Sequence, residues 1–155
     1  MDEQERQELL ALTHPVQVDE GELIITQGRL VQNLWFMLEG RCEVNRRTES
    51  GCTLKLAELE PTTVFGEMSF FHAAPHSADV IALTKMKLLR LGREDFDRLA
   101  FQRHPVAFKL MFNSLEQLSD RLRQTDQWIT DLVCRENHQP SPSEWTTFCE
   151  ILFRG

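Results

Sequence analysis

The stretch that decides the fold runs from Phe65 to Val80 and reads FGEMSFFHAAPHSADV. Gly66 has no side chain, so the backbone at this point can approach a bound group closely. Free N–H groups at the start of a helix, together with the aligned peptide dipoles, favour an anion such as a phosphate. Pro75 shapes a turn near the end of the stretch. These residues, which we call the cassette, predict a phosphate-binding site centred on Gly66.

The cassette resembles the signature of cyclic-nucleotide-binding domains of the catabolite-activator and regulatory-kinase-subunit kind. In that family a Phe-Gly-Glu opens a short helix, and a Pro-Arg-Ser/Thr/Ala-Ala closes the site. The resemblance implies that N–H groups following Gly66 hold a cyclic phosphate, that Glu67 accepts a hydrogen bond from the ribose 2′-hydroxyl, and that Ser77 supports the phosphate. The ligand-binding residues expected on this basis are Gly66, Glu67, Met68, Ser69, His76 and Ser77, with Thr125 from a later helix.

One landmark of the signature is changed, because His76 stands where the family has arginine. Histidine lacks the planar fork of arginine and is mostly neutral near pH 7 unless its cation is stabilised. Its phosphate contact should therefore be weak and pH-dependent, and His76→Arg should raise affinity if only the charge is missing. Asp79 either pairs with His76 and keeps it charged or lies where an anion gains nothing. Two interpretations follow: a site for cyclic AMP or cyclic GMP, and a vestigial site.

The resemblance extends over roughly residues 16–130. β-Branched and alternating runs bounded by glycines and polar turns predict strands. A hairpin is expected across Glu39-Gly40. The expected strands lie within Gly21–Gly28, Leu34–Glu39, Arg41–Val44, Cys52–Leu59, Ser77–Leu83 and Lys85–Leu91. Such short strands with helices on either side predict a mainly β fold, a double-stranded β-helix or jelly roll, plus a long C-terminal helix. Where the family has a glycine-acid pair before Phe-Gly-Glu, this chain has Pro61-Thr62-Thr63-Val64, which predicts a stiffer turn.

The long helix begins at Pro105, after a first helix with an apolar face that includes Phe96 and Leu99. A seven-residue apolar repeat then predicts a parallel two-stranded coiled coil between subunits, the alternative being a helix packed lengthwise on its own domain. The repeat consists of Phe108, Met111, Leu115, Leu118, Leu122, Thr125, Ile129 and Leu132. We expect three parts: a β-roll with its flanking helices over residues 1–103, the long helix over 104–134, and a linker with a short helix over 135–155.

The segment 135–155 contains residues that predict a short helix of its own. Ser141-Pro142-Ser143-Glu144 is a capping box with proline at the first helical position. Trp145, Phe148, Cys149 and Leu152 would share one face of that helix. This face would pack on the roll, fold back as a lid on the pocket, pack on a dimer partner, or dock on another protein.

Composition narrows the function further. The net charge of −7 and the pI near 5.2 argue against direct binding to DNA. The absence of a membrane-length apolar window and of a secretion signal makes a cytoplasmic location the expectation. Four widely spread cysteines without a Cys-x-x-Cys pair predict reduced thiols, with neither a zinc site nor a disulfide framework. No catalytic motif is present, and no metal or cofactor is expected. His72 and His76 lie four apart, but Pro75 separates them and no third ligand is evident.

We therefore expect a dimeric, non-enzymatic sensory or regulatory domain that transmits ligand occupancy through its C-terminal helix to an unidentified partner protein. The alternative is a ligand-free adaptor or dimerisation module that acts by protein–protein interaction.

Overall fold

The computed structural model of the chain describes residues 2–135. Two compact units divide it, Met1–Ser114 and Leu115–Gly155. The first contains all the strands, and the second contains the greater part of the long helix. The helix predicted around Trp145 and Phe148 lies outside the described residues.

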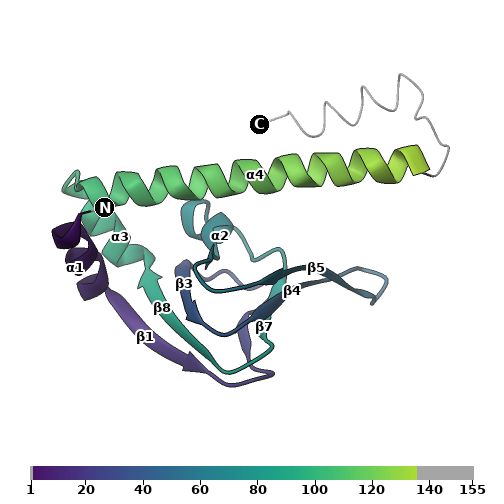
Figure 1. Cartoon of the computed structure of the whole chain (residues 1–155), viewed down its shortest axis with the longest axis horizontal. Coiled ribbons are helices and arrows are strands. Elements are labelled where there is room, and N and C mark those ends of the chain that lie inside the picture. Colours follow the sequence, from purple (N-terminus) through teal and green to yellow (C-terminus); the bar gives the residue numbers. More distant parts are fainter. Residues whose placement is uncertain (1, 136–155) are drawn as a thin grey trace. The chain divides into compact units, whose positions relative to one another are not determined.

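Two four-stranded antiparallel sheets form the first unit (Figure 1). The first sheet, sheet A, has the order β1-β8-β3-β6, and the second, sheet B, has the order β2-β7-β4-β5. Their bounds are β1 Thr13–Val18, β2 Leu23–Ile25, β3 Asn33–Glu39, β4 Cys42–Arg47, β5 Thr53–Leu59, β6 Val64–Phe65, β7 Asp79–Ala82 and β8 Met86–Gly92. This arrangement confirms the predicted mainly β roll.

The hairpin predicted across Glu39-Gly40 is wrong, because β3 and β4 lie in different sheets. Gly40 has a positive φ of 95°, and a Cβ there would lie 2.6 Å from the Lys85 carbonyl oxygen. The chain thus passes directly against the turn before β8, where Leu83 N–H also bonds to the Arg41 carbonyl. This close crossing carries β4 away from β3 and into sheet B, and it requires glycine.

Apolar side chains divide into two clusters. One fills the space between the sheets and includes Trp35, Met37, Cys42, Val80 and Leu88. The other packs the helices against sheet A and is built on Leu34, Leu91 and side chains of the helices. Alternation along β3 puts Trp35 and Met37 into the first cluster and Leu34 into the second, so sheet A is buried on both faces.

Within residues 2–135, four helices accompany the sheets: α1 Glu3–Leu12, α2 Glu67–Phe71, α3 Arg93–Phe101 and α4 Pro105–Arg135. Figure 1 shows α1, α3 and the start of α4 gathered at one end of sheet A. The predicted apolar face of α3 is confirmed, since Phe96 and Leu99 are buried. The predicted start of the long helix at Pro105 is also confirmed.

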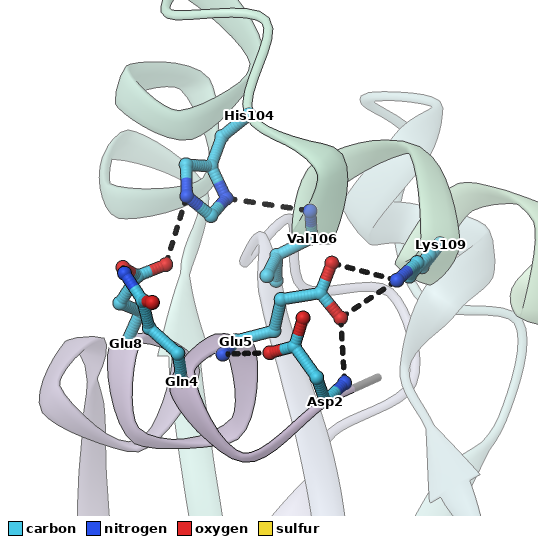
Figure 2. Close-up of polar contacts among 7 residues, drawn as sticks. All are labelled: Asp2, Gln4, Glu5, Glu8, His104, Val106 and Lys109. Carbon is cyan, nitrogen blue, oxygen red and sulfur yellow. Dashed lines mark hydrogen bonds and ion pairs between the residues drawn. The ribbon is translucent and has the colours of Figure 1, made fainter.

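An ion pair and a hydrogen bond fasten α1 to the beginning of α4 (Figure 2). Lys109 Nζ lies 2.6 Å from both carboxylate oxygens of Glu5, and His104 Nε2 lies 2.8 Å from Glu8 Oε2. The other ring nitrogen of His104, Nδ1, accepts a hydrogen bond from Val106 N–H, one of the unpaired donors in the first turn of α4. We call Glu5, Glu8, His104 and Lys109 the clasp.

No helix within residues 2–135 is both long and apolar enough to cross a membrane. Cys42, Cys52 and Cys134 are free thiols, and Cys149 lies outside the described residues.

Candidate ligand-binding site

Gly66 sits in a conformation that other residues adopt with strain. Its φ is 87°, and a Cβ added there would lie 2.7 Å from the Asn33 carbonyl oxygen and 3.2 Å from Trp35 Cδ1. It immediately precedes α2, and its carbonyl accepts the Phe70 N–H at 3.1 Å. Both the backbone angle and the lack of room demand glycine, so the start of α2 is held directly against β3.

The short helix that follows buries polar groups. Glu67 is only 2% exposed and Ser69 only 3%, although both side chains are hydrophilic. Met68 between them is exposed. A carboxylate and a hydroxyl in this position are rarely buried without a polar role.

His76 is buried and held by backbone contacts to the loop after β2. Its N–H donates to the Arg29 carbonyl at 2.9 Å, and its own carbonyl accepts the Gly28 N–H at 2.8 Å. Burial lowers the pKa of the His76 imidazole below its usual value, and the hydrogen bond to the Val31 backbone offsets that shift only in part. His76 is therefore a neutral imidazole near pH 7. Ser77, the next residue, is exposed.

The sequence left open whether Asp79 pairs with His76, and in the structure Asp79 pairs with Arg47 instead. Arg47 Nε lies 2.9 Å from Asp79 Oδ2, and the Gln27 N–H donates to Asp79 Oδ1 at 2.7 Å. The Gln27 amide in turn bonds to both backbone groups of Arg47, at 2.7 and 3.0 Å. The carboxylate thus ties β7 to β4 and to the turn after β2, and His76 gains no charge from it.

Strand β2 brings the two halves of the cassette together. Ile25 pairs with Val80 on β7, and its Cδ1 lies 3.5 Å from the position of a Gly66 Cβ. The loop that continues β2 is the one that holds His76. Gly66 and His76 therefore border the same strand and its loop, although they are ten positions apart. Thr125 belongs to the second unit, where its hydroxyl donates to the Arg121 carbonyl at 2.9 Å.

The far end of α2 is joined to α3. The Phe70 carbonyl accepts hydrogen bonds from Arg93 Nη1 at 2.7 Å and from Gln32 Nε2 at 3.0 Å. Phe70, Phe71 and Phe96 meet edge to face, with ring centroids 5.0 to 5.5 Å apart, and the Arg93 guanidinium lies over two of these rings. Sequence reasoning missed Arg93, Gln32 and Arg47, since no local pattern shows which distant carbonyl or carboxylate a long side chain reaches.

The turn before the cassette, which departs from the family pattern, contains a residue with an unusual backbone conformation. Thr62 has a φ of 71°, in the left-handed region that a β-branched residue rarely enters. Two backbone hydrogen bonds hold it there. Thr62 N–H donates to the Met37 carbonyl, and Met37 N–H donates to the Thr63 carbonyl. The predicted stiffness of this turn corresponds to a strained threonine.

A double-layered antiparallel roll, with a short helix that begins after a left-handed glycine and precedes β7, is the architecture of a class of small ligand-binding sensor domains. Comparison with known proteins makes the assignment specific. The family described as "Cyclic nucleotide-binding domain" matches residues 15–103, more than half of the chain. The chain belongs to this family.

Three relatives illustrate the similarity. The chain is 25% identical over 119 residues to the CRP-like cAMP-activated global transcriptional regulator of Mycobacterium tuberculosis, a match that covers 77% of this chain and 51% of that protein. It is 36% identical over 89 residues to the cAMP-dependent protein kinase regulatory subunit of Yarrowia lipolytica, covering 57% of this chain and 23% of that protein. The crystal structure of Thermus thermophilus Catabolite Activator Protein superposes with a TM-score of 0.74 at 30% identity, covering 85% of this chain and 60% of that one. The chain thus spans about half of the length of the first of these two curated relatives and about a quarter of the second.

Proposed function

We propose that this chain is a cyclic-nucleotide-binding sensory or regulatory domain that holds a cyclic mononucleotide in its cassette. The observation that carries the proposal is Gly66, which is forced into a left-handed conformation against β3 with Glu67 and Ser69 buried directly behind it. N–H groups following Gly66, including those of Met68 and Ser69, receive the phosphate together with the Ser77 hydroxyl. Glu67 accepts the ribose hydroxyl. His76, being neutral, contributes a hydrogen bond or shape but no full charge.

Occupancy would be transmitted from α2 to α3 and then to α4. The Phe70 carbonyl and ring are fixed to Arg93 and Phe96, so a shift of α2 on ligand binding must be followed by α3. Two arrangements of these contacts with different ligand affinity are what such coupling requires. Thr125 is proposed as a further ligand contact from α4.

Dimerisation through α4 is supported by the stripe that the helix leaves uncovered. Val106, Ala107, Leu110 and Ser114 are buried within the first unit, whereas the predicted seam residues Phe108 and Met111 are 49% and 45% exposed. One face of the beginning of α4 therefore packs within the first unit, and the face that carries the predicted seam is left exposed. In the second unit Leu115 and Leu122 are likewise exposed. We propose a parallel homodimer along Phe108, Met111, Leu115, Leu118, Leu122, Ile129 and Leu132, which sedimentation velocity would detect.

The dimer would act on a partner protein and catalyse no reaction itself. The relatives named above are regulators by their printed names, and the net charge of −7 disfavours direct contact with DNA. Within residues 2–135 no group of three or more His, Cys, Asp or Glu residues is placed to hold a metal ion.

Calorimetric titration with cyclic AMP and cyclic GMP at pH 8 and pH 6 tests the proposal. Measurable binding of either nucleotide is expected, with little gain in affinity at pH 6, because burial lowers the pKa of His76 and disfavours the charged ring. Binding that strengthens clearly at pH 6 would mean that His76 is charged in the complex. Silence with both nucleotides at millimolar concentration would favour the ligand-free adaptor.

A further inference from the structure

The inner face of β4 continues beyond the core and ends in an arginine. Cys42 and Val44 point into the cluster between the sheets, so alternation places Arg46 on the same face. The β4–β7 ladder ends at the pair Asn45 and Asp79, while the β4–β5 ladder continues with Arg46 opposite Leu54. If the antiparallel register continued by one residue, the position opposite Arg46 would be Ala78 of the cassette, which adjoins the proposed phosphate contact Ser77.

Neighbouring cations on sheet B already have partners. Arg47, on the opposite face of β4, is paired with Asp79, and Arg41 is paired with Glu58. Lys55 lies within 3.5 Å of Glu43 and 3.0 Å of Glu58. Arg46, by contrast, is exposed, and among residues 2–135 its side chain has no hydrogen bond or ion pair. A guanidinium without a partner, on the face of the strand that leads into the cassette, is available to a ligand.

A cyclic phosphate bound at Gly66 would lack a cation from the cassette itself. Glu67 adds a buried carboxylate nearby, and His76 is held as a ring among backbone groups. We propose that Arg46 supplies the positive charge for the ligand phosphate, so that the arginine absent from the cassette is replaced by one from β4. This inference rests on the proposed function and names a specificity-determining residue for the same site.

The chemistry follows from the guanidinium. Its planar fork can donate two parallel N–H bonds to a phosphate, and it carries its charge at every physiological pH. A contact supplied from β4 would close the ligand between the cassette and sheet B. Binding would then depend on salt concentration and would be independent of pH around neutrality.

The test is calorimetric titration of the full-length protein with cyclic AMP and cyclic GMP at low and high salt. We expect Arg46→Gln to weaken binding by about ten- to a hundredfold and to reduce the salt dependence. Arg46→Lys should recover part of the loss. Arg29→Gln is the matched control, since Arg29 lies in the loop that holds His76, is exposed, and loses the same charge. It should bind as the wild type does.

If Arg46→Gln binds the nucleotide as tightly as the wild type does, the inference is overturned and the proposed function stays intact. The same holds if only Arg29→Gln loses affinity. A wild type that binds neither nucleotide would overturn both. The thermal unfolding midpoint of Arg46→Gln should equal that of the wild type. If the midpoint of Arg46→Gln differs, the wild-type protein is used instead, and the NMR resonance of Arg46 Nε–Hε is followed during titration with cyclic AMP. The proposal requires this resonance to shift. A resonance that does not shift in a saturated complex refutes the contact.

Discussion

The clasp and the cassette are held together mainly by different kinds of contact. In the clasp, Glu5 meets Lys109 and Glu8 meets His104, so each charged or polar group is matched by a side chain of the same chain (Figure 2). Around the cassette, the contacts that fix the shape are mainly backbone bonds and a glycine without room for a side chain, and Arg46 nearby has no partner among the described residues. The first region is completed by its own residues, and the second is arranged as though a further group were to arrive.

The largest loss of stability should come from Gly66→Ala, which disturbs the backbone packing of the cassette. The new Cβ would combine left-handed strain with overlap on the Asn33 carbonyl, costing about 2–4 kcal/mol of unfolding free energy. Gly51→Ala is a matched control, because Gly51 has nearly the same φ of 83° and nothing within 4 Å of the added carbon. It should cost about 1 kcal/mol in urea unfolding. Equal losses would show that there is no tight contact at Gly66.

A smaller effect is expected from Lys109→Met, which opens the clasp. The ammonium group and the Asp2 N–H hold the pKa of Glu5 below its usual value, so the unfolded state binds more protons. This contribution to stability is present above about pH 4.5 and disappears as the pH falls through the folded-state pKa. Lys109→Met should therefore lower the unfolding midpoint by about 2–5 °C at pH 7. The difference from wild type should shrink below about pH 4.5.

Lys87→Met supplies the control for that measurement. Lys87 pairs with Glu39 at 2.9 Å, but both side chains are more than half exposed, and such surface pairs contribute little. Its midpoint should change by no more than about 1 °C. A drop as large as that of Lys109→Met would indicate a general effect of charge and would remove the special role of the clasp. Neither substitution should alter nucleotide affinity.

The smallest effect, and one of opposite sign, is predicted for Thr62→Gly. Glycine relieves the left-handed strain at a φ of 71°, a gain that is partly cancelled by the greater freedom of the unfolded chain. The net result should be a stabilisation of about 0.5–1 kcal/mol in urea unfolding. Destabilisation would mean that the threonine side chain contributes contacts that outweigh its backbone strain.

Local patterns in the sequence predicted the elements well and their partners poorly. Six of the eight described strands, the start at Pro105 and the glycine of the cassette are decided within a few residues, and the structure has them where they were expected, whereas β1 and β6 were not predicted. The strands on either side of Gly40 were assigned to one hairpin, because the sequence shows a turn but cannot show that it packs against Met86. Register between distant strands depends on such contacts.

Within the candidate site, the positions of Gly66 and Glu67 followed from the motif, whereas the state of His76 did not. Whether a histidine is charged depends on its burial and on the groups around it, and these come from the loop after β2. The partner of Asp79 was equally inaccessible, since Arg47 lies 32 positions away along the chain. Long side chains that cross between strands are the part of a site that a single sequence leaves undetermined.

One carboxylate in the clasp serves two structures at once. Glu5 accepts the Asp2 N–H and thereby closes the capping box of α1, and the same oxygens receive Lys109 from α4. The first turn of α1 therefore cannot fray without loosening its hold on α4, and a displacement of α4 would expose the amides of that turn to exchange with solvent. Amide exchange in the first turn of α1 would therefore report a displacement of α4 near Lys109, 104 positions further along the chain.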